Sequence, residues 1–142
     1  MTMQDTKLAL LVDRFMRQIH FGLQSKAPTF DTEKVGPGGG VILLTLADMW
    51  CPGLHELTQR VARDKSQMTR MIRSLETKGL VARKPSPADA RVTLVCLTDE
   101  GEAFVKVLQQ AVAETIDDIL APISNAEKRS LSALLARALH SG

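Results

Sequence analysis

The chain has 142 residues, of which 44% are hydrophobic, 4% are aromatic and 24% are charged, and its formal net charge is +2. This length predicts one domain, and this apolar fraction excludes an intrinsically disordered chain. No run of about 18 apolar residues occurs and no signal-peptide pattern opens the chain, so we expect a cytoplasmic protein without a membrane span.

Residues 5–25 place apolar side chains three and four positions apart, which predicts a long amphipathic helix. Residues 26–40 contain two prolines and four glycines, a composition typical of a loop. The next residues, VILLTLADMW, are almost wholly apolar and predict a helix that begins near Pro37 and ends before Pro52. The glycines at 38–40 would weaken its first turn by roughly 1 kcal/mol each relative to alanine.

The middle of the chain predicts two short helices, of about ten and about fifteen residues, joined by a tight turn. Asp64 can cap the second helix, with Gln67 three residues on as in a capping box. Gly79 can end that helix in the left-handed conformation. The expected apolar faces consist of Leu54, Leu57 and Val61 in the first helix and Met68, Met71, Ile72 and Leu75 in the second.

Two alternating, β-branched runs at 80–84 and 91–98 enclose the sequence PSPADA and predict a β-hairpin with a long loop. Thr98 can then cap a helix whose first turn is acidic, which suits the helix dipole. A second capping box predicts a last helix. The predicted elements are then helices and one hairpin, so the expected fold class is mainly α (α+β). The side chains that this last helix is expected to bury are Leu131, Leu134, Leu135, Ala138 and Leu139.

The small net charge conceals a basic middle. Residues 54–91 contain nine Lys or Arg and four Asp or Glu, a net charge of +5 that leaves −3 for the rest of the chain. This distribution favours a polyanionic partner, although an ordinary solvated surface would also account for the charge alone. The order helix, turn, helix, hairpin is that of a winged helix, whose second helix has the dimensions to enter the major groove of double-stranded DNA.

Burial of the apolar face of that second helix would turn its polar side chains outward. There, Gln can form hydrogen bonds with adenine and Arg with guanine. Prolines stiffen the cationic hairpin loop, and we expect Asp89 to pair with Arg91 or a neighbouring arginine and fix its direction. Gln67, Arg70 and Lys65 are expected to read bases. Contacts to the DNA backbone are expected from Ser66, Thr69, Arg73, Arg83 and Lys84, and Arg91 is expected to approach the minor groove.

The stretch from Leu57 to Gly101 resembles the MarR family of bacterial transcriptional regulators, whose pattern joins a helix–turn–helix to a Leu-Glu-x-x-Gly-Leu-Val-x-Arg junction. A wing with Asp-x-Arg and a Leu-Thr-x-x-Gly segment follow in that pattern. Two positions depart from it: Thr58 stands where the family often has Ala, and the glycine run at 38–40 is unusual. The matching positions are Leu75, Glu76, Gly79, Leu80, Val81, Arg83, Asp89, Arg91, Leu97, Thr98 and Gly101.

The resemblance implies one MarR-like domain over 1–142, with the winged helix at about 38–98 and dimerisation helices at about 5–25 and 102–140. It implies an obligate homodimer that represses genes by binding a pseudo-palindromic operator. It also implies release of DNA when a small phenolic or anionic effector, an oxidant or a metal is sensed, with no cofactor. By the same analogy, the effector pocket would include Phe15, Ile19, His20, Leu44, Asp48 and Trp50; plain core packing is the alternative for these side chains.

The two cysteines are too few and too far apart in the sequence for a disulfide framework or a CxxC metal site. Cys51 is a candidate redox sensor or, alternatively, a small buried side chain, whereas Cys96 is expected in the core. The three histidines at 20, 55 and 140 lack paired ligands, so no metal site is expected.

Two other classes of function are an enzyme and a protein-interaction module. The sequence contains no nucleophile elbow, phosphate-binding loop, HExxH motif or clustered carboxylate pair, so we expect no enzyme. A winged helix that makes only protein contacts is an alternative, because a fold does not fix a function. Such a docking face would carry exposed apolar anchors, whereas here it is basic.

Overall fold

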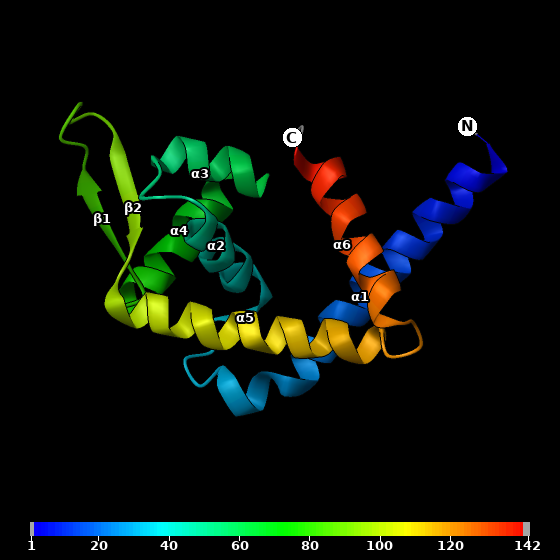
Figure 1. The fold of residues 1–142 in the computed structure, drawn as a ribbon. Coiled ribbons are helices and arrows are strands. Elements are labelled where there is room, and N and C mark those ends of the chain that lie inside the picture. The colour runs from blue at the N-terminus through cyan, green and yellow to red at the C-terminus, as the bar shows by residue number, and fades with distance from the viewer. Residues whose placement is uncertain (1, 141–142) are drawn as a thin grey trace. The chain divides into compact units, whose positions relative to one another are not determined.

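The computed structural model describes residues 2–140, which form six helices and one two-stranded antiparallel sheet (Figure 1), confirming the mainly α class. No helix within this part of the chain is both long and apolar enough to cross a bilayer. The elements are α1 Met3–Phe30, α2 Gly36–Asp48, α3 Leu54–Val61, α4 Lys65–Thr77, β1 Val81–Pro85, β2 Thr93–Leu97, α5 Asp99–Ile119 and α6 Asn125–His140.

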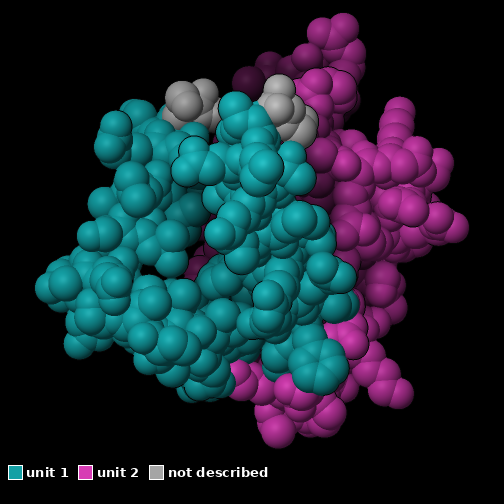
Figure 2. Space-filling model, turned by 90° about the vertical axis from the view of Figure 1, so that its right-hand side faces the viewer, with its two compact units in different colours: residues 1–23, 112–142 teal, residues 24–111 magenta. Residues whose placement is uncertain are grey.

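The chain divides into two compact units, which Figure 2 shows in different colours. Residues 24–111 form one unit, which contains α2, α3, α4, the hairpin and the adjoining parts of α1 and α5. The described residues of 1–23 and 112–142 form the other unit, which contains the start of α1, the end of α5 and all of α6.

The core of the 24–111 unit lies where α2 meets α3, α4 and β2. As expected, α3 buries Leu57, and α4 buries Met68, Ile72 and Leu75. Burial of one face of α4 leaves the opposite face of the same helix in solvent. The side chains with less than 2% exposure are Ile42, Leu43, Leu57, Met68, Ile72, Leu75 and Val95.

The glycine run lets α2 lie close to α4. A Cβ added at Gly38 would lie 2.8 Å from the sulfur of Met71. A Cβ at Gly39 would lie 2.7 Å from Cγ1 of Val35 and 3.4 Å from Cδ2 of Leu75. The weak first turn of α2 therefore has a packing function, because the absence of side chains allows the helix backbone to contact the inner face of α4.

The expected loop over 26–40 is largely wrong. Helix α1 continues through Pro28 to Phe30, and α2 already begins at Gly36. The ring of Phe30 packs on that of Phe104 with centroids 6.5 Å apart, so a tertiary contact stabilises this last turn of α1. The Asp31 carboxylate then accepts the backbone N–H groups of Val35 and Gly36, at 2.8 and 2.9 Å, and fixes the short connection.

The segment from Gly79 to Gly101 fastens the hairpin to the end of α4. Gly79 has φ of 76° and ends α4 as predicted, and the Leu80 N–H donates to the Leu75 carbonyl at 3.0 Å. At the other end of the hairpin, the Thr98 hydroxyl donates to the Gly79 carbonyl at 2.6 Å and accepts the Gly101 N–H at 3.0 Å. Thr98 therefore caps α5, as expected, and also closes the base of the hairpin.

The terminal helices present much of their apolar surface to solvent. Neither α1 nor α6 contains a buried residue among those described. The expectation that α6 buries its leucines is wrong for the single chain, because no second surface covers them. The expected capping box is present, since Ser124 and Glu127 exchange hydrogen bonds of 2.8 and 3.1 Å. Large exposed side chains include Leu8, Leu10, Leu11, Met16 and Phe21 of α1 and Leu134, Leu135 and Leu139 of α6.

Gly101→Ala should destabilise the protein by about 1–3 kcal/mol, the usual range for overpacking. The reason is that a Cβ at position 101 would collide with the carbonyl oxygen of Leu80. Chemical denaturation monitored by circular dichroism measures the change. Gly40→Ala is the matched control: its Cβ would meet Leu108 at an ordinary 3.5 Å, so alanine should be neutral or stabilising by up to about 1 kcal/mol. Equal stabilities for the two variants would contradict the proposed close approach.

Candidate nucleic-acid interface

Helix α4 presents its polar face to solvent. The Asp64 carboxylate caps it by accepting the Gln67 N–H at 3.3 Å, as predicted. Thr69 is half-buried, and its hydroxyl donates to the Lys65 carbonyl at 3.0 Å. The remaining candidate residues of this helix, Lys65, Ser66, Gln67, Arg70 and Arg73, are exposed. The polar surface of α4 is therefore free to contact a partner along its length.

The hairpin carries a preformed ion pair next to its tip. Its strands pair in antiparallel register from Val81 with Leu97 to Pro85 with Thr93. Arg91 donates from Nε and Nη2 to the two carboxylate oxygens of Asp89, at 3.1 and 3.2 Å, which confirms the expected pairing. These hydrogen bonds, together with one from the Arg91 backbone N–H, hold the pKa of the Asp89 carboxyl below its usual value. The Arg91 side chain is 91% exposed, so it is oriented while still open to solvent.

Arg83 has a partner that the sequence reading did not foresee. Its Nη2 lies 3.0 Å from Oε1 of Glu76, which also accepts from its Nε at 3.2 Å. This pair joins β1 to the last turn of α4, and both side chains are only about one-third exposed. The guanidinium is thus already bound to a carboxylate, and its contact with a phosphate stays a prediction. Lys84, the next residue, is exposed.

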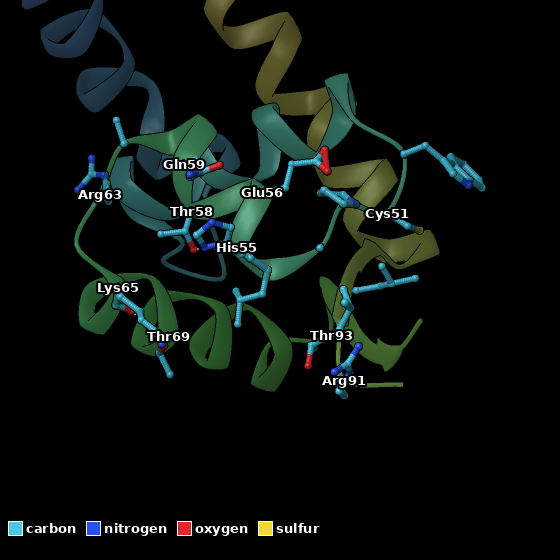
Figure 3. A pocket seen from close by; sticks show the side chains of 17 residues that line it. Cys51, His55, Glu56, Thr58, Gln59, Arg63, Lys65, Thr69, Arg91 and Thr93 are labelled. Carbon is cyan, nitrogen blue, oxygen red and sulfur yellow. Dashed lines mark hydrogen bonds between the residues drawn. The ribbon is translucent and has the colours of Figure 1, made fainter. Parts of the chain in front are cut away.

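A hollow of about 1020 Å³ brings α3, α4 and the wing together on one face of the 24–111 unit (Figure 3). Lys65 and Thr69 of α4 line it together with Arg91, which precedes β2. Sequence reasoning missed several polar side chains that also line this hollow. Four of them lie on α3 or in the turn after it, and their place on the polar side of that helix was the available signal; Thr93 begins β2. These residues are His55, Thr58, Gln59, Arg63 and Thr93.

The predicted effector-binding residues are not gathered in one hollow. Leu44 and Asp48 line a second hollow of about 490 Å³, together with Arg60 and Gln109. Asp48 and Arg60 form a 3.7 Å ion pair there, with both side chains mostly exposed. Trp50 lines the larger hollow instead and is 90% exposed. The other three belong to the 1–23 segment, where Phe15 and Ile19 are half-buried and His20 is exposed.

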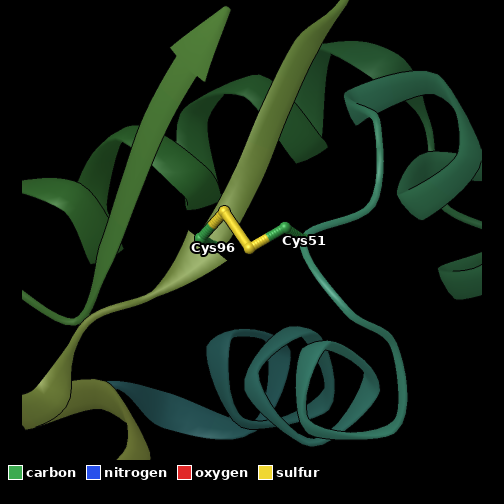
Figure 4. Close-up of a disulfide and its surroundings, with 2 residues drawn as sticks. All are labelled: Cys51 and Cys96. Atoms are coloured by element: carbon green, nitrogen blue, oxygen red, sulfur yellow. A yellow bond between two sulfur atoms is a disulfide. The ribbon is translucent and has the colours of Figure 1, made fainter. Parts of the chain in front are cut away.

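The two cysteines form a disulfide between the loop after α2 and strand β2 (Figure 4). This bond was not predicted, because the two cysteines lie 45 residues apart in the sequence and were expected to form no disulfide framework. The residues after Cys51 run beside β2, so the Val95 N–H donates to the Pro52 carbonyl at 2.9 Å. Cys96 is 8% exposed, in agreement with its expected place in the core.

A helix–turn–helix followed by a cationic two-stranded wing defines the class of winged-helix DNA-binding proteins. The family model described as "MarR family" matches residues 39–93. PecS of Dickeya dadantii, an HTH-type transcriptional regulator, is 30% identical over 135 residues, which cover 93% of this chain and 75% of PecS. The chain belongs to the MarR family of transcriptional regulators, which bind DNA.

Other proteins are similar to this chain over different lengths. The uncharacterized HTH-type regulator YdgJ of Bacillus subtilis is 37% identical over 82 residues, which cover 58% of this chain and only 50% of YdgJ. The apo structure of MarR from E. coli has a TM-score of 0.77 and 25% identity, covering 93% of this chain and 96% of MarR. A mutant of the same E. coli protein in complex with operator DNA has a TM-score of 0.73, 25% identity and 96% coverage of each chain. The structure of Bordetella bronchiseptica BpsR, whose DNA binding is regulated by 6-hydroxynicotinic acid, has a TM-score of 0.72 and 25% identity, covering 92% of this chain and 91% of BpsR.

Arg91→Ala should raise the pKa of the Asp89 carboxyl toward the ordinary value of 3.8, because it removes the hydrogen bonds that lower it most. In the folded native protein the pKa of Asp89 lies below 3.8. The ion pair is therefore intact above pH 3.8 and is lost as the pH falls through the pKa of the folded state. NMR titration of the Asp89 side-chain carbon measures both values. Arg83→Ala is the control, since Arg83 pairs with Glu76 and its loss should leave the Asp89 titration unchanged.

Proposed function

We propose that this protein is a cytoplasmic repressor, without enzymatic activity, that binds a pseudo-palindromic operator as a homodimer and releases it on binding a small effector. The observation that carries the proposal is the shared face around the larger hollow. There, α4 and the wing present Lys65, Thr69 and Arg91 together, and Arg91 is held in one direction by Asp89. A protein that reads a major groove with a helix and an adjacent groove with a wing needs this juxtaposition.

The exposed side chains of α4 fall into two chemical groups toward DNA. Arg70 and Gln67 can make paired hydrogen bonds to guanine and adenine, and Lys65 can also donate to guanine. Hydroxyls and cations elsewhere on the face suit phosphate oxygens, which set the register without reading sequence. The residues proposed for phosphate contacts are Ser66, Thr69, Arg73, Arg83 and Lys84. Arg91 is proposed to lie in or near the minor groove, where narrow A·T-rich segments attract arginine.

The terminal helices are proposed to form the dimer. Apolar side chains such as Leu11 and Leu134 are 51% and 59% exposed in the single chain, and a second copy would cover them. A two-fold dimer places two α4 helices in a symmetric arrangement, and this symmetry is why the operator is proposed to be a pseudo-palindrome.

A small phenolic or anionic molecule is the proposed effector. The regulation of BpsR by 6-hydroxynicotinic acid gives a precedent within the fold. In this chain, the smaller hollow offers the Arg60 guanidinium and apolar wall from Leu44, a combination that suits an aromatic anion. For this, Arg60 would have to break its ion pair with Asp48. The pair is exposed and its charged atoms are 3.7 Å apart, so breaking it costs little free energy. Effector binding is also proposed to involve Phe15, Ile19, His20 and Trp50.

Fluorescence-anisotropy titrations against the DNA upstream of the protein's own gene, and against scrambled DNA, test the proposal across a series of salt concentrations. Preference for the first DNA, with affinity falling as salt rises, is the expected result. Addition of a hydroxylated aromatic acid such as 6-hydroxynicotinic acid should lower that affinity. A folded dimer that binds neither DNA at low salt would overturn the DNA-binding role.

Arg70→Ala and Lys84→Ala should weaken binding in different ways. Loss of Arg70 should reduce affinity for the operator by about 1–3 kcal/mol and spare scrambled DNA, if its guanidinium pairs with guanine. Loss of Lys84 should weaken binding to every sequence alike and lower the salt slope by about 1, because it removes one phosphate contact. Uniform weakening by Arg70→Ala would show that Arg70 does not read a base.

Leu134→Glu should dissociate the dimer, because it places a charge in an apolar surface that the second copy is proposed to cover. Sedimentation velocity at several protein concentrations measures the change. Ala133→Glu, at an exposed position on the opposite side of the same helix from Leu131 and Leu135, is the control and should leave the dimer intact. A dimer that persists with glutamate at position 134 would place the interface elsewhere.

A further inference from the structure

Glu76 links the last turn of α4 to the first strand of the wing. Its Oε1 atom accepts hydrogen bonds from Nε and Nη2 of Arg83, at 3.2 and 3.0 Å. Seven residues separate the two in the sequence, and the chain turns between them at Gly79, whose φ is 76°. The pair therefore fixes the direction of a wing arginine relative to the helix that is proposed to enter the major groove.

The register of the hairpin places Arg83 on the side of the sheet that faces the core. Arg83 lies opposite Val95, which is fully buried, and Val81 on the same side is only 2% exposed. Side chains alternate along a strand, so Lys84 leaves the sheet on the other side. The arginine side chain thus starts over the apolar interior and carries its charged end out to Glu76, where both side chains are about one-third exposed.

Arg83 and Arg91 are held by carboxylates through the same edge of the guanidinium. Each arginine donates from Nε and Nη2, Arg83 to Glu76 and Arg91 to Asp89. The guanidinium is planar, so a carboxylate on this edge also sets the direction of the two N–H groups on Nη1. Those two N–H groups are the ones that each arginine can donate to a further acceptor, such as a phosphate oxygen.

An acidic side chain in this position opposes DNA binding unless it has a second role. Thr69, Arg73 and Glu76 are spaced by four and three residues, so they lie along one side of α4. Thr69 lines the larger hollow together with Arg91, so this side of the helix borders the wing. A carboxylate among groups that are proposed to contact phosphates adds repulsion toward DNA. Orientation of Arg83 is the role by which the geometry offsets this repulsion.

We propose that Glu76 is a positioning residue for DNA binding. It holds Arg83 so that Nη1 donates to a backbone phosphate between the major groove occupied by α4 and the groove at the wing tip. This role rests on the proposed DNA-binding function. A free arginine side chain loses rotamer entropy when it takes up one direction on a phosphate, whereas a held one has already lost it. Such contacts fix the register of a protein on the duplex, so a loosened Arg83 reduces the preference for the operator.

The test measures Glu76→Gln in the full chain by anisotropy titration, on operator DNA and on scrambled DNA. The amide keeps the size of the side chain and removes its charge. The operator affinity should fall roughly 3–10-fold, while the affinity for scrambled DNA stays equal or rises. Glu100→Gln is the matched control, because it removes one negative charge at an exposed position in the first turn of α5. It should leave the ratio of the two affinities unchanged.

Arg83→Ala and the double variant show whether Glu76 acts through Arg83. Arg83→Ala should weaken operator binding and lower the salt slope by about 1, because one phosphate contact is lost. Glu76→Gln should then cause no further loss in the Arg83→Ala background. Arg83→Lys keeps the charge without the planar fork, so it should behave like Glu76→Gln and keeps the test open if alanine impairs folding. Thermal melting followed by circular dichroism checks that each variant is folded.

Several results would overturn the positioning role while DNA binding stands. They are an operator affinity that Glu76→Gln leaves equal or raises, an equal loss in the Arg83→Ala background, the same fall in the affinity ratio with Glu100→Gln, and a salt slope that Arg83→Ala leaves unchanged. Absence of binding to either DNA by the native protein would instead overturn the DNA-binding function, and the role of Glu76 with it.

Discussion

The burial of Met68, Ile72 and Leu75 is the constraint on which the rest of the interface depends. These side chains hold α4 against α2 and the hairpin, and their spacing determines which residues of the helix face outward. Gly38 makes this contact close, because a Cβ there would lie only 2.8 Å from the sulfur of Met71 in α4. A change of register in α4 by one residue toward the C-terminus would turn Thr69, Arg73 and Glu76 toward the core. The polar face is thus a consequence of apolar packing, and its chemistry toward DNA follows from it.

Besides the Cys51–Cys96 disulfide, several weak links position the base of the wing. Thr98 joins the start of α5 to the carbonyl of Gly79, Glu76 pairs with Arg83, and the loop after α2 pairs with β2. Each link is a local hydrogen bond or ion pair, yet together they connect the wing to α3, α4 and α5. Asp89 extends this order to the tip by directing Arg91. The hairpin can therefore be small and still present a cation in a defined direction.

The sequence predicted the features that depend on neighbouring residues. The caps at Asp64 and Thr98 and the Asp89–Arg91 pair join positions at most three residues apart, so their chemistry is visible in a short window. The helix end at Gly79 follows from a single residue type. Features set by distant segments were missed. The last turn of α1 depends on Phe104, and the disulfide depends on a loop lying beside β2. The separation of Leu44 and Asp48 from Trp50, which lines a different hollow, likewise depends on the packing of distant segments. The resemblance to a family supplied the function, which local patterns alone left open.

The exposed leucines of the terminal helices have a consequence for folding. Neither α1 nor α6 buries a described side chain within the single chain, so this unit has little core of its own. In the proposed dimer its apolar surface is covered only on association, and the free energy of folding then includes the free energy of dimerisation. The melting temperature should consequently depend on protein concentration. A cell that makes few copies of such a regulator holds a larger fraction of them as loosely folded monomers, which proteases remove first. The concentration of active dimer would therefore rise more than in proportion to the rate of synthesis.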